Sequence, residues 1–327
     1  MFEKGYYERV GIRLFDKLPK YRERYDSLCT NSQIAFLMGL IRERGMRNVL
    51  EIGTHNGVSA LYMLKAGAEK LYALELKEGD FYGRAVLKEA SKKELASFHL
   101  NSGRTSFDIG EIIPAGEKLD LVFIDGDHCH PYPLFDLIHI VPYLHDDSVV
   151  VLHDVIEHYD PSAWGGSFIF EGWTAGKYRQ LSLDSKTDGT MGCIKIPKDK
   201  EALLENILRI AKLPIRADIW KTGENDKYLG FDEQHLERLK IFMEKHYGEN
   251  FANRIYDALL KRYEEYMENW IFYVHETRFK DFLHKRAEKL AHSLNEFKMA
   301  SENKPERPNG IIRNLFRPQK PKRRFIK

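Results

Sequence analysis

The sequence has few of the features that mark exported, membrane-spanning or metal-knuckle proteins. Its 327 residues include three cysteines at wide spacing, which fits neither a disulfide framework nor a zinc site. The longest apolar runs, such as VVVL, are well short of the roughly 18 residues that cross a bilayer. The first residues are charged throughout and lack an apolar signal-peptide core. We therefore expect a cytoplasmic protein with reduced thiols and no membrane span.

The chain also lacks a strong charge of one sign, because its net charge is only +2. A polyanion partner for the whole chain is therefore not indicated. The C-terminal tail differs: from Lys304 onward it holds nine Lys or Arg, one Glu and four prolines. We expect residues 301–327 to be disordered. Their charge is either merely solubilising or suited to contact with nucleic acid, an anionic surface or an acidic partner.

A third absence concerns the glycine turn in VLEIGTHNGVS, residues 49–59. An apolar strand ends there, and the pattern of a helix follows. Gly53 and Gly57 have the spacing G-x-x-x-G, and the third glycine of the dinucleotide fingerprint G-x-G-x-x-G is missing. A dehydrogenase that binds NAD is therefore not favoured. The unpaired backbone N–H groups in the first turn of the helix predict a binding site for a small polar ligand.

Acids and histidines follow three of the predicted strands. Glu75 ends an apolar strand 24 positions after Glu51, where a carboxylate can accept hydrogen bonds from ribose hydroxyls. The strand over residues 119–124 runs into IDGDHCH, and DSVVVLHDV ends in His153 and Asp154. Because ligands bind outside the carboxyl ends of such strands, we expect these groups to meet at one edge of the sheet.

The segments NSQIAFLMGLIRERG, VLEIGTHNGVSAL, FIDGDH, VVVLHD and GTMGCIKIP follow one another between Thr30 and Pro197. This series resembles the class I S-adenosylmethionine-dependent methyltransferases. Within that family it is most similar to the small-molecule and sugar O-methyltransferases. The alternation of strands and helices predicts the same fold class, an α/β, doubly wound and mostly parallel Rossmann-like sheet. Strands over residues 181–183 and 191–196 are expected to form an antiparallel edge.

The resemblance implies which residues bind the cofactor S-adenosylmethionine. They come from the glycine turn, from the ends of the second and third strands and from the end of the fourth: Glu51, Gly53, Thr54, Gly57, Ser59, Glu75, Asn101, Ser102 and Asp125.

The groups expected to flank the acceptor are Asp125, His128, His153 and Asp154. In one interpretation, which the resemblance implies, Mg²⁺ is held by Asp125 and Asp154, completed by Asp127 or His153, and lowers the pKa of the acceptor hydroxyl. This chain lacks the adjacent Asp-Asn pair of the catechol-type metal site. In the other interpretation, no metal is needed and His128 or His153 removes the acceptor proton.

Four regions are predicted: an N-terminal helical segment over residues 1–29, a methyltransferase domain over 30–197, a C-terminal helical module over 198–300 and the basic tail over 301–327. The module has apolar and aromatic residues at helical spacing, among them Tyr256, Leu260, Tyr263, Met267, Trp270 and Val274. It is expected to cover the active site or to form a homo-oligomer. Glycines 165, 166, 172 and 176, set among aromatic residues, suggest a substrate loop.

The sequence therefore predicts an S-adenosylmethionine-dependent methyltransferase that methylates a hydroxyl of a small molecule, sugar or glycan. Two alternatives stay open at this point. One is a non-catalytic methyltransferase-fold scaffold that docks a partner through the helical module and the tail. The other is an RNA ribose methyltransferase, which the basic tail would suit.

Overall fold

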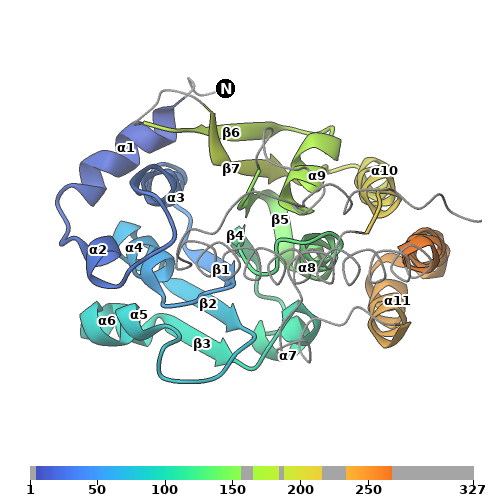
Figure 1. The fold of residues 1–327 in the computed structure, drawn as a ribbon, viewed down its shortest axis with the longest axis horizontal. Helices are drawn as coiled ribbons and strands as arrows, with labels where there is room; N and C mark the ends of the chain where they lie inside the picture. The colour runs from blue at the N-terminus through green and yellow to red at the C-terminus, as the bar shows by residue number, and fades with distance from the viewer. Residues whose placement is uncertain (1–4, 156–164, 184–187, 216–232, 267–327) are drawn as a thin grey trace, which may run out of the picture. The chain divides into compact units, whose positions relative to one another are not determined.

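A computed structural model describes residues 5–155, 165–183, 188–215 and 233–266 (Figure 1). These residues belong to one compact unit that spans residues 1–268. Its seven strands are β1 (Asn48–Ile52), β2 (Lys70–Glu75), β3 (Phe98–Ser102), β4 (Leu119–Ile124), β5 (Leu144–Leu152), β6 (Lys177–Leu181) and β7 (Asp188–Lys195). The principal helices are α1 (Tyr6–Phe15), α2 (Tyr21–Arg24), α3 (Asn31–Arg44), α4 (Val58–Ala66), α5 (Arg84–Glu89), α6 (Lys92–Ala96), α7 (Ile109–Ile112), α8 (Tyr132–Ile140), α9 (Gly165–Gly172), α10 (Lys200–Ala211) and α11 (Glu233–Tyr247). Residues 249–266 are also helical.

The strands form a single sheet in the order β3-β2-β1-β4-β5-β7-β6. The first five are parallel, and β7 is antiparallel to both β5 and β6. The predicted fold class and its antiparallel edge are thus confirmed. The strand predicted around residues 181–183 lies four residues earlier, as β6 at Lys177–Leu181, because its sequence KYRQL has too few apolar residues to mark its start.

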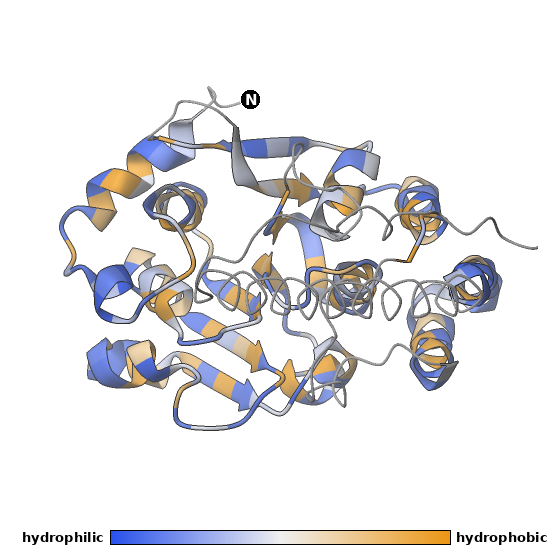
Figure 2. Cartoon of the chain, viewed as in Figure 1, coloured by the Kyte–Doolittle hydropathy of each residue, from blue (hydrophilic) through white to orange (hydrophobic). Residues whose placement is uncertain are grey.

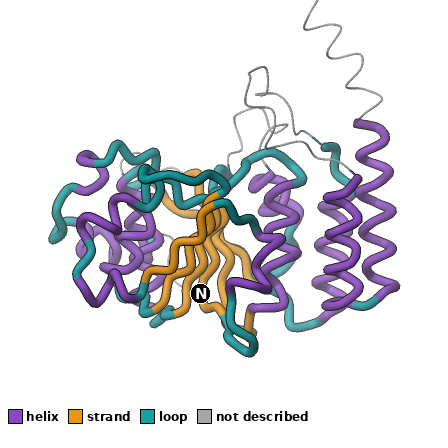
Figure 3. The backbone as a smooth tube through the Cα atoms, turned by 90° about the horizontal axis from the view of Figure 1, so that it is seen from below, coloured by secondary structure: helices purple, strands orange, loops and turns teal. Residues whose placement is uncertain are grey.

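Helices cover the sheet on both faces (Figure 3). Successive residues of a strand point to opposite faces, so Leu50 joins the core cluster that includes α8 to α11, whereas Val49 joins the one that includes α1 to α4. Both residues are fully buried. Apolar residues accordingly occur along the strands as well as on the helices beside them (Figure 2). Burial on both faces is the reason that the central strands read as near-continuous apolar runs.

The N-terminal helix α1 packs closely against α3 because two glycines allow their backbones to meet. A Cβ added at Gly11 would lie 1.7 Å from the carbonyl oxygen of Ala35, and one added at Gly39 would lie 1.9 Å from that of Tyr7. At the other side of α1, the buried Glu8 carboxylate accepts the backbone N–H of Leu181 at 2.6 Å. Helix α1 therefore ties α3 to the edge strand β6.

Part of the predicted C-terminal module packs on the same core. Residues of α10, α11 and the following helix, including Tyr256 and Tyr263, belong to or pack against the cluster around α8. Met267, Trp270, Val274 and the tail over residues 301–327 lie outside the described residues, and the four predicted region boundaries stay predictions. Within the described ranges, no helix has the length and apolar character needed to span a membrane.

Candidate active site

The glycine turn between β1 and α4 is shaped by close backbone contacts. Gly53 has a φ of 91°, and a Cβ added there would lie 2.1 Å from the carbonyl oxygen of Asp125. Gly57 has a φ of 81° and precedes α4, and a Cβ there would lie 2.8 Å from the Cα of Gly83. Both positions favour glycine by conformation and by space. The turn can therefore lie directly against the end of β4.

Glu51 lies fully buried beneath this turn and does not line the cavity described below. Its carboxylate accepts hydrogen bonds from the hydroxyls of Thr54, at 2.6 Å, and Ser59. Burial raises the pKa of Glu51 to about 8. Thr54 and Ser59 do line the cavity. The effect of Glu51 on a ligand therefore passes through these two hydroxyls.

Glu75 ends β2 with its side chain on the cavity wall. One carboxylate oxygen accepts the backbone N–H of His55 at 2.9 Å, and the other accepts that of Lys77 at 3.2 Å. These bonds fix the carboxylate at the edge of the sheet. Since each oxygen can accept more than one hydrogen bond, Glu75 can still bind a pair of hydroxyls.

The structure places the end of β3 differently from the prediction. Neither Asn101 nor Ser102 lines the cavity, and the Asn101 amide donates to the carbonyl of His99 at 2.9 Å. The cavity is lined instead by the residues that follow the turn at Gly103, namely Arg104, Thr105, Ser106 and Phe107. The predicted contact of Asn101 and Ser102 with the cofactor stays a prediction, while the cavity wall begins a few residues further along the chain.

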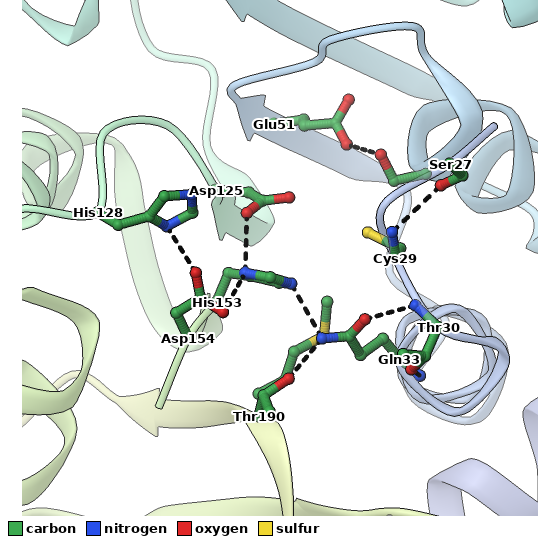
Figure 4. A network of polar contacts seen from close by, with 12 residues as sticks. Ser27, Cys29, Thr30, Gln33, Glu51, Asp125, His128, His153, Asp154 and Thr190 are labelled. Carbon is green, nitrogen blue, oxygen red and sulfur yellow. Dashed lines mark hydrogen bonds and ion pairs between the residues drawn. The ribbon is translucent and has the colours of Figure 1, made fainter. Parts of the chain in front are cut away.

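The ends of β4 and β5 bring the predicted acids and histidines together (Figure 4). His153 Nδ1 lies 3.1 Å from Asp125 Oδ1 and 3.0 Å from Asp154 Oδ1. The other oxygen of Asp154 lies 3.0 Å from His128 Nδ1. Asp154 has a φ of 53°, in the left-handed region that is unusual for a residue with a side chain. Such strained backbone is often found at functional sites.

Burial and mutual charge act in opposite directions within this cluster. Burial raises the pKa of Asp125, although the nearby imidazoles lower it. Burial also opposes charge on His153, but Asp125 and Asp154 outweigh it and raise the pKa of His153 well above its usual value. For Asp154, burial is outweighed by His153, so that the pKa of this carboxyl is lowered. Burial therefore opposes the ionisation of Asp125, whereas the imidazole of His153 favours the ionised form of Asp154.

One cavity of about 870 Å³ joins the glycine turn, Glu75 and the acid–imidazole cluster. Its wall continues past Phe107 to Asp136 of α8 and to His235 and Arg238 of α11. Burial raises the pKa of Asp136 to about 7. The guanidinium of Arg238 lies 4.9 Å from the centre of the Phe107 ring. Helix α11 therefore forms part of the cavity wall. The cavity volume is within the usual range of about 300–1,000 Å³ for ligand sites.

The donor set does not favour the predicted magnesium ion. The Asp127 carboxylate accepts the backbone N–H of Cys129 at 2.8 Å, and Asp127 is in neither of the two side-chain groups that could jointly hold a metal within the described residues. Each of those groups contains His153, together with Cys29 and Asp125 or with His128 and Asp154. Mg²⁺ prefers oxygen ligands, whereas imidazole and thiolate suit other divalent ions.

Several residues of the site were not predicted from the sequence. Cys29 lines the cavity beside the cluster, and Gln33 contacts His153 across 120 positions of sequence. The segment TNSQ could have identified Gln33 as part of a helix cap, but nothing in it indicates a contact with β5. The cysteines are free thiols, as predicted.

The predicted substrate loop is also wrong for its described part. Residues 165–172 form α9, and no residue of 165–176 lines the cavity. Phe170 and Trp173 are buried in the core. A Cβ added at Gly166 would lie 2.3 Å from the carbonyl oxygen of His153, so this glycine allows α9 to pack on the end of β5. Trp164 lies outside the described residues.

Residues 50–155 match the family model described as a methyltransferase domain, which confirms the resemblance predicted for this stretch. No curated protein sequence matches the chain.

Solved structures similar to this chain include an O-methyltransferase from Bacillus cereus in complex with SAH, with 19% sequence identity, coverage of 60% of this chain and 92% of that chain, and a TM-score of 0.42. The O-methyltransferase TomG from Streptomyces achromogenes, involved in tomaymycin synthesis and solved with SAM, shows 19% identity, covers 60% and 99% of the two chains, and has a TM-score of 0.44. Neither likeness determines the acceptor of this chain.

Proposed function

We propose that this protein transfers the methyl group of S-adenosylmethionine to a hydroxyl of a small molecule, sugar or glycan. The observation that carries the proposal is a single cavity in which Glu75 and the pair His128–Asp154 face the same space. The Glu75 carboxylate can accept hydrogen bonds from the sugar hydroxyls of a nucleoside, and the His128–Asp154 pair can remove a proton. The methyltransferase domain match over residues 50–155 supports the same reaction class.

The cofactor end of the cavity fits the nucleoside and the amino-acid part of S-adenosylmethionine. Glu75 would accept hydrogen bonds from the two ribose hydroxyls, and Thr54 and Ser59 would contact the amino-acid part near the glycine turn. Thr105 and Ser106 would border the base. The cofactor supplies a methyl group already activated on a sulfonium, so the protein must provide proximity, orientation and a base.

His128 is the better candidate for that base. Its Nδ1 faces the Asp154 carboxylate at 3.0 Å, which holds the Nδ1 proton and leaves Nε2 as the nitrogen that can accept a proton. His128 also lines the cavity, with 38% of its side chain exposed. His153 is less suited, because its Nδ1 faces two carboxylates and its Nε2 lies 2.9 Å from the Gln33 amide. Asp154 would thus orient His128, which takes the proton of the acceptor hydroxyl.

Calorimetry with S-adenosylhomocysteine and S-adenosylmethionine tests the cofactor assignment on the full-length protein. We expect saturable binding of both, and the absence of any heat would instead favour the non-catalytic scaffold. Release of S-adenosylhomocysteine in the presence of catechols, sugars or structured RNA would then identify the acceptor class. Turnover with RNA alone would contradict the small-molecule assignment. Self-association through the C-terminal helices and nucleic-acid contact by the tail stay predictions.

A further inference from the structure

The imidazole of His153 lies between the carboxylates of Asp125 and Asp154, the two acids that were predicted to share a divalent ion. Its Nδ1 is 3.1 Å from one carboxylate and 3.0 Å from the other. This nitrogen is buried, and neither contact meets the geometry of a hydrogen bond. Both are therefore electrostatic contacts with the carboxylates, drawn as dashed lines in Figure 4.

The position of the His153 proton follows from Gln33 at the start of α3. The backbone N–H of Thr30 donates to Gln33 Oε1 at 2.6 Å, and Thr30 Oγ1 accepts the backbone N–H of Gln33 in return. This capping box fixes which end of the amide is the NH₂ group. The NH₂ group contacts Thr190 Oγ1 at 2.5 Å and His153 Nε2 at 2.9 Å. The two carboxylates favour a second proton on the ring, but a proton on Nε2 would face the amide NH₂ group of Gln33. Nε2 is therefore the acceptor, and the single ring proton is on Nδ1.

We propose that the Nδ1–H of His153 takes the place of a divalent cation between Asp125 and Asp154, with Gln33 as the residue that positions this tautomer. This inference rests on the proposed methyl transfer and specifies how its acceptor is activated. A nitrogen that carries a proton has no lone pair to offer to a metal. The N–H group instead supplies partial positive charge to both acids at once. The two carboxylates are thus compensated without an ion.

This arrangement has a consequence for the acceptor. An enzyme that activates its acceptor through Mg²⁺ needs substrate oxygens that can bind the ion. Here the pair His128–Asp154 acts on one hydroxyl at a time. The acceptor therefore needs a single hydroxyl that reaches His128 and does not need two adjacent oxygens.

Two measurements on the full-length wild-type protein test the inference. After purification without chelators, elemental analysis and calorimetry with MgCl₂, MnCl₂ and ZnCl₂ should reveal no stoichiometric ion. Nitrogen-15 NMR of labelled histidine at neutral pH should show His153 protonated at Nδ1. An ion bound in stoichiometric amount at this cluster, or an unprotonated Nδ1, would overturn the proposal.

A substitution provides a gain-of-binding test. His153→Asn removes the ring and adds an amide oxygen beside the two acids, so we expect measurable Mg²⁺ binding that the wild type lacks. His145→Asn is the matched control, because His145 contacts Asp120 at the other end of the same strand. No gain in His153→Asn, or an equal gain in His145→Asn, contradicts the proposal. If His153→Asn fails to fold, the wild-type measurements still decide.

Calorimetry with S-adenosylhomocysteine on the same samples separates this inference from the proposed function. A stoichiometric ion together with intact S-adenosylhomocysteine binding would refute the role of His153 and leave methyl transfer standing. If the wild-type protein does not bind S-adenosylhomocysteine, the proposed function is refuted, whatever the protonation state of His153.

Discussion

Strand β5 has a histidine–aspartate contact near each of its ends, and the two contacts have similar distances but differ in exposure and surroundings. Near its start, His145 Nε2 lies 2.9 Å from Asp120 Oδ1, with 36% and 26% of the side chains exposed. Just past its end, His153 contacts Asp125 and Asp154, and these side chains are 14–17% exposed. Only the second group borders the cavity. Chemistry at this sheet thus depends on the edge at which a residue lies.

The carboxylates at the two edges are stabilised in different ways. Asp120 accepts the backbone N–H groups of Arg47 and Asn48 at 2.7 and 2.8 Å. Burial opposes its ionisation, but these bonds and His145 lower the pKa of Asp120 below its usual value. At the other edge, burial raises the pKa of Asp125 and Glu51. The amino edge therefore holds a structural acid, and the carboxyl edge holds acids that can respond to a ligand.

The largest expected effect separates the two histidines that contact these acids. His128→Ala should lower kcat by about 10²- to 10⁴-fold, because the acceptor loses its general base, while S-adenosylhomocysteine affinity changes little. His145→Ala should leave kcat within about twofold, since His145 is remote from the cavity and surface substitutions have small effects. Steady-state kinetics with an identified acceptor provides the comparison. Equal losses in both variants would show that the edges do not differ as proposed.

The next effect concerns the cofactor end of the carboxyl edge. Glu75→Ala should weaken S-adenosylhomocysteine binding by about 10- to 100-fold, because two hydrogen bonds to a charged group are lost. Glu78→Ala, a neighbouring exposed acid, is the control and should bind as the wild type does. Calorimetric Kd values decide between them. Unchanged affinity in Glu75→Ala would exclude the ribose assignment.

The raised pKa of Glu51 predicts a pH dependence of stability. Its folded-state pKa is about 8 against a usual value of 4.5. The folded state therefore binds the additional proton between these values, and the free energy of unfolding should fall as pH rises through this window, by up to about 1.4 kcal/mol per pH unit. Glu51→Gln, which cannot ionise, should show a smaller slope between pH 5.5 and 7.5 in urea unfolding. Parallel slopes would disprove the assignment.

The smallest effect is expected at the amino edge. Asp120→Asn should reduce the free energy of unfolding by about 1 kcal/mol at neutral pH, because the charge-assisted bonds from two backbone N–H groups weaken. Since the pKa of Asp120 is lowered in the folded state, its contribution is present above the usual pKa of 3.8 and is lost as pH falls through the lowered value. Urea unfolding measures the stability of Asp120→Asn and of the wild type, and steady-state kinetics measures their kcat. If kcat falls by more than the loss of folded protein accounts for, the role of Asp120 is not purely structural.

Much of the fold could be predicted because its signals are local. The central strands are apolar on both faces, so β1, β2, β4 and β5 could be located from sequence runs. Strand β6 could not, because KYRQL lies at the edge of the sheet and is only partly buried. Residues 165–172 were expected to form a loop because glycines are common in loops. They form a helix whose glycines permit close packing on β5.

The sequence by itself determined that acids and histidines end β4 and β5 and that a glycine turn ends β1, because parallel strands deliver their ends to one edge of a sheet. Tertiary structure alone decided what each group does there. Glu51 is buried under the turn, Thr105 and Ser106 line the cavity, and Gln33 reaches His153 from a distant helix. Hydrogen-bond direction and burial depend on groups far apart in the chain, so no local pattern encodes them.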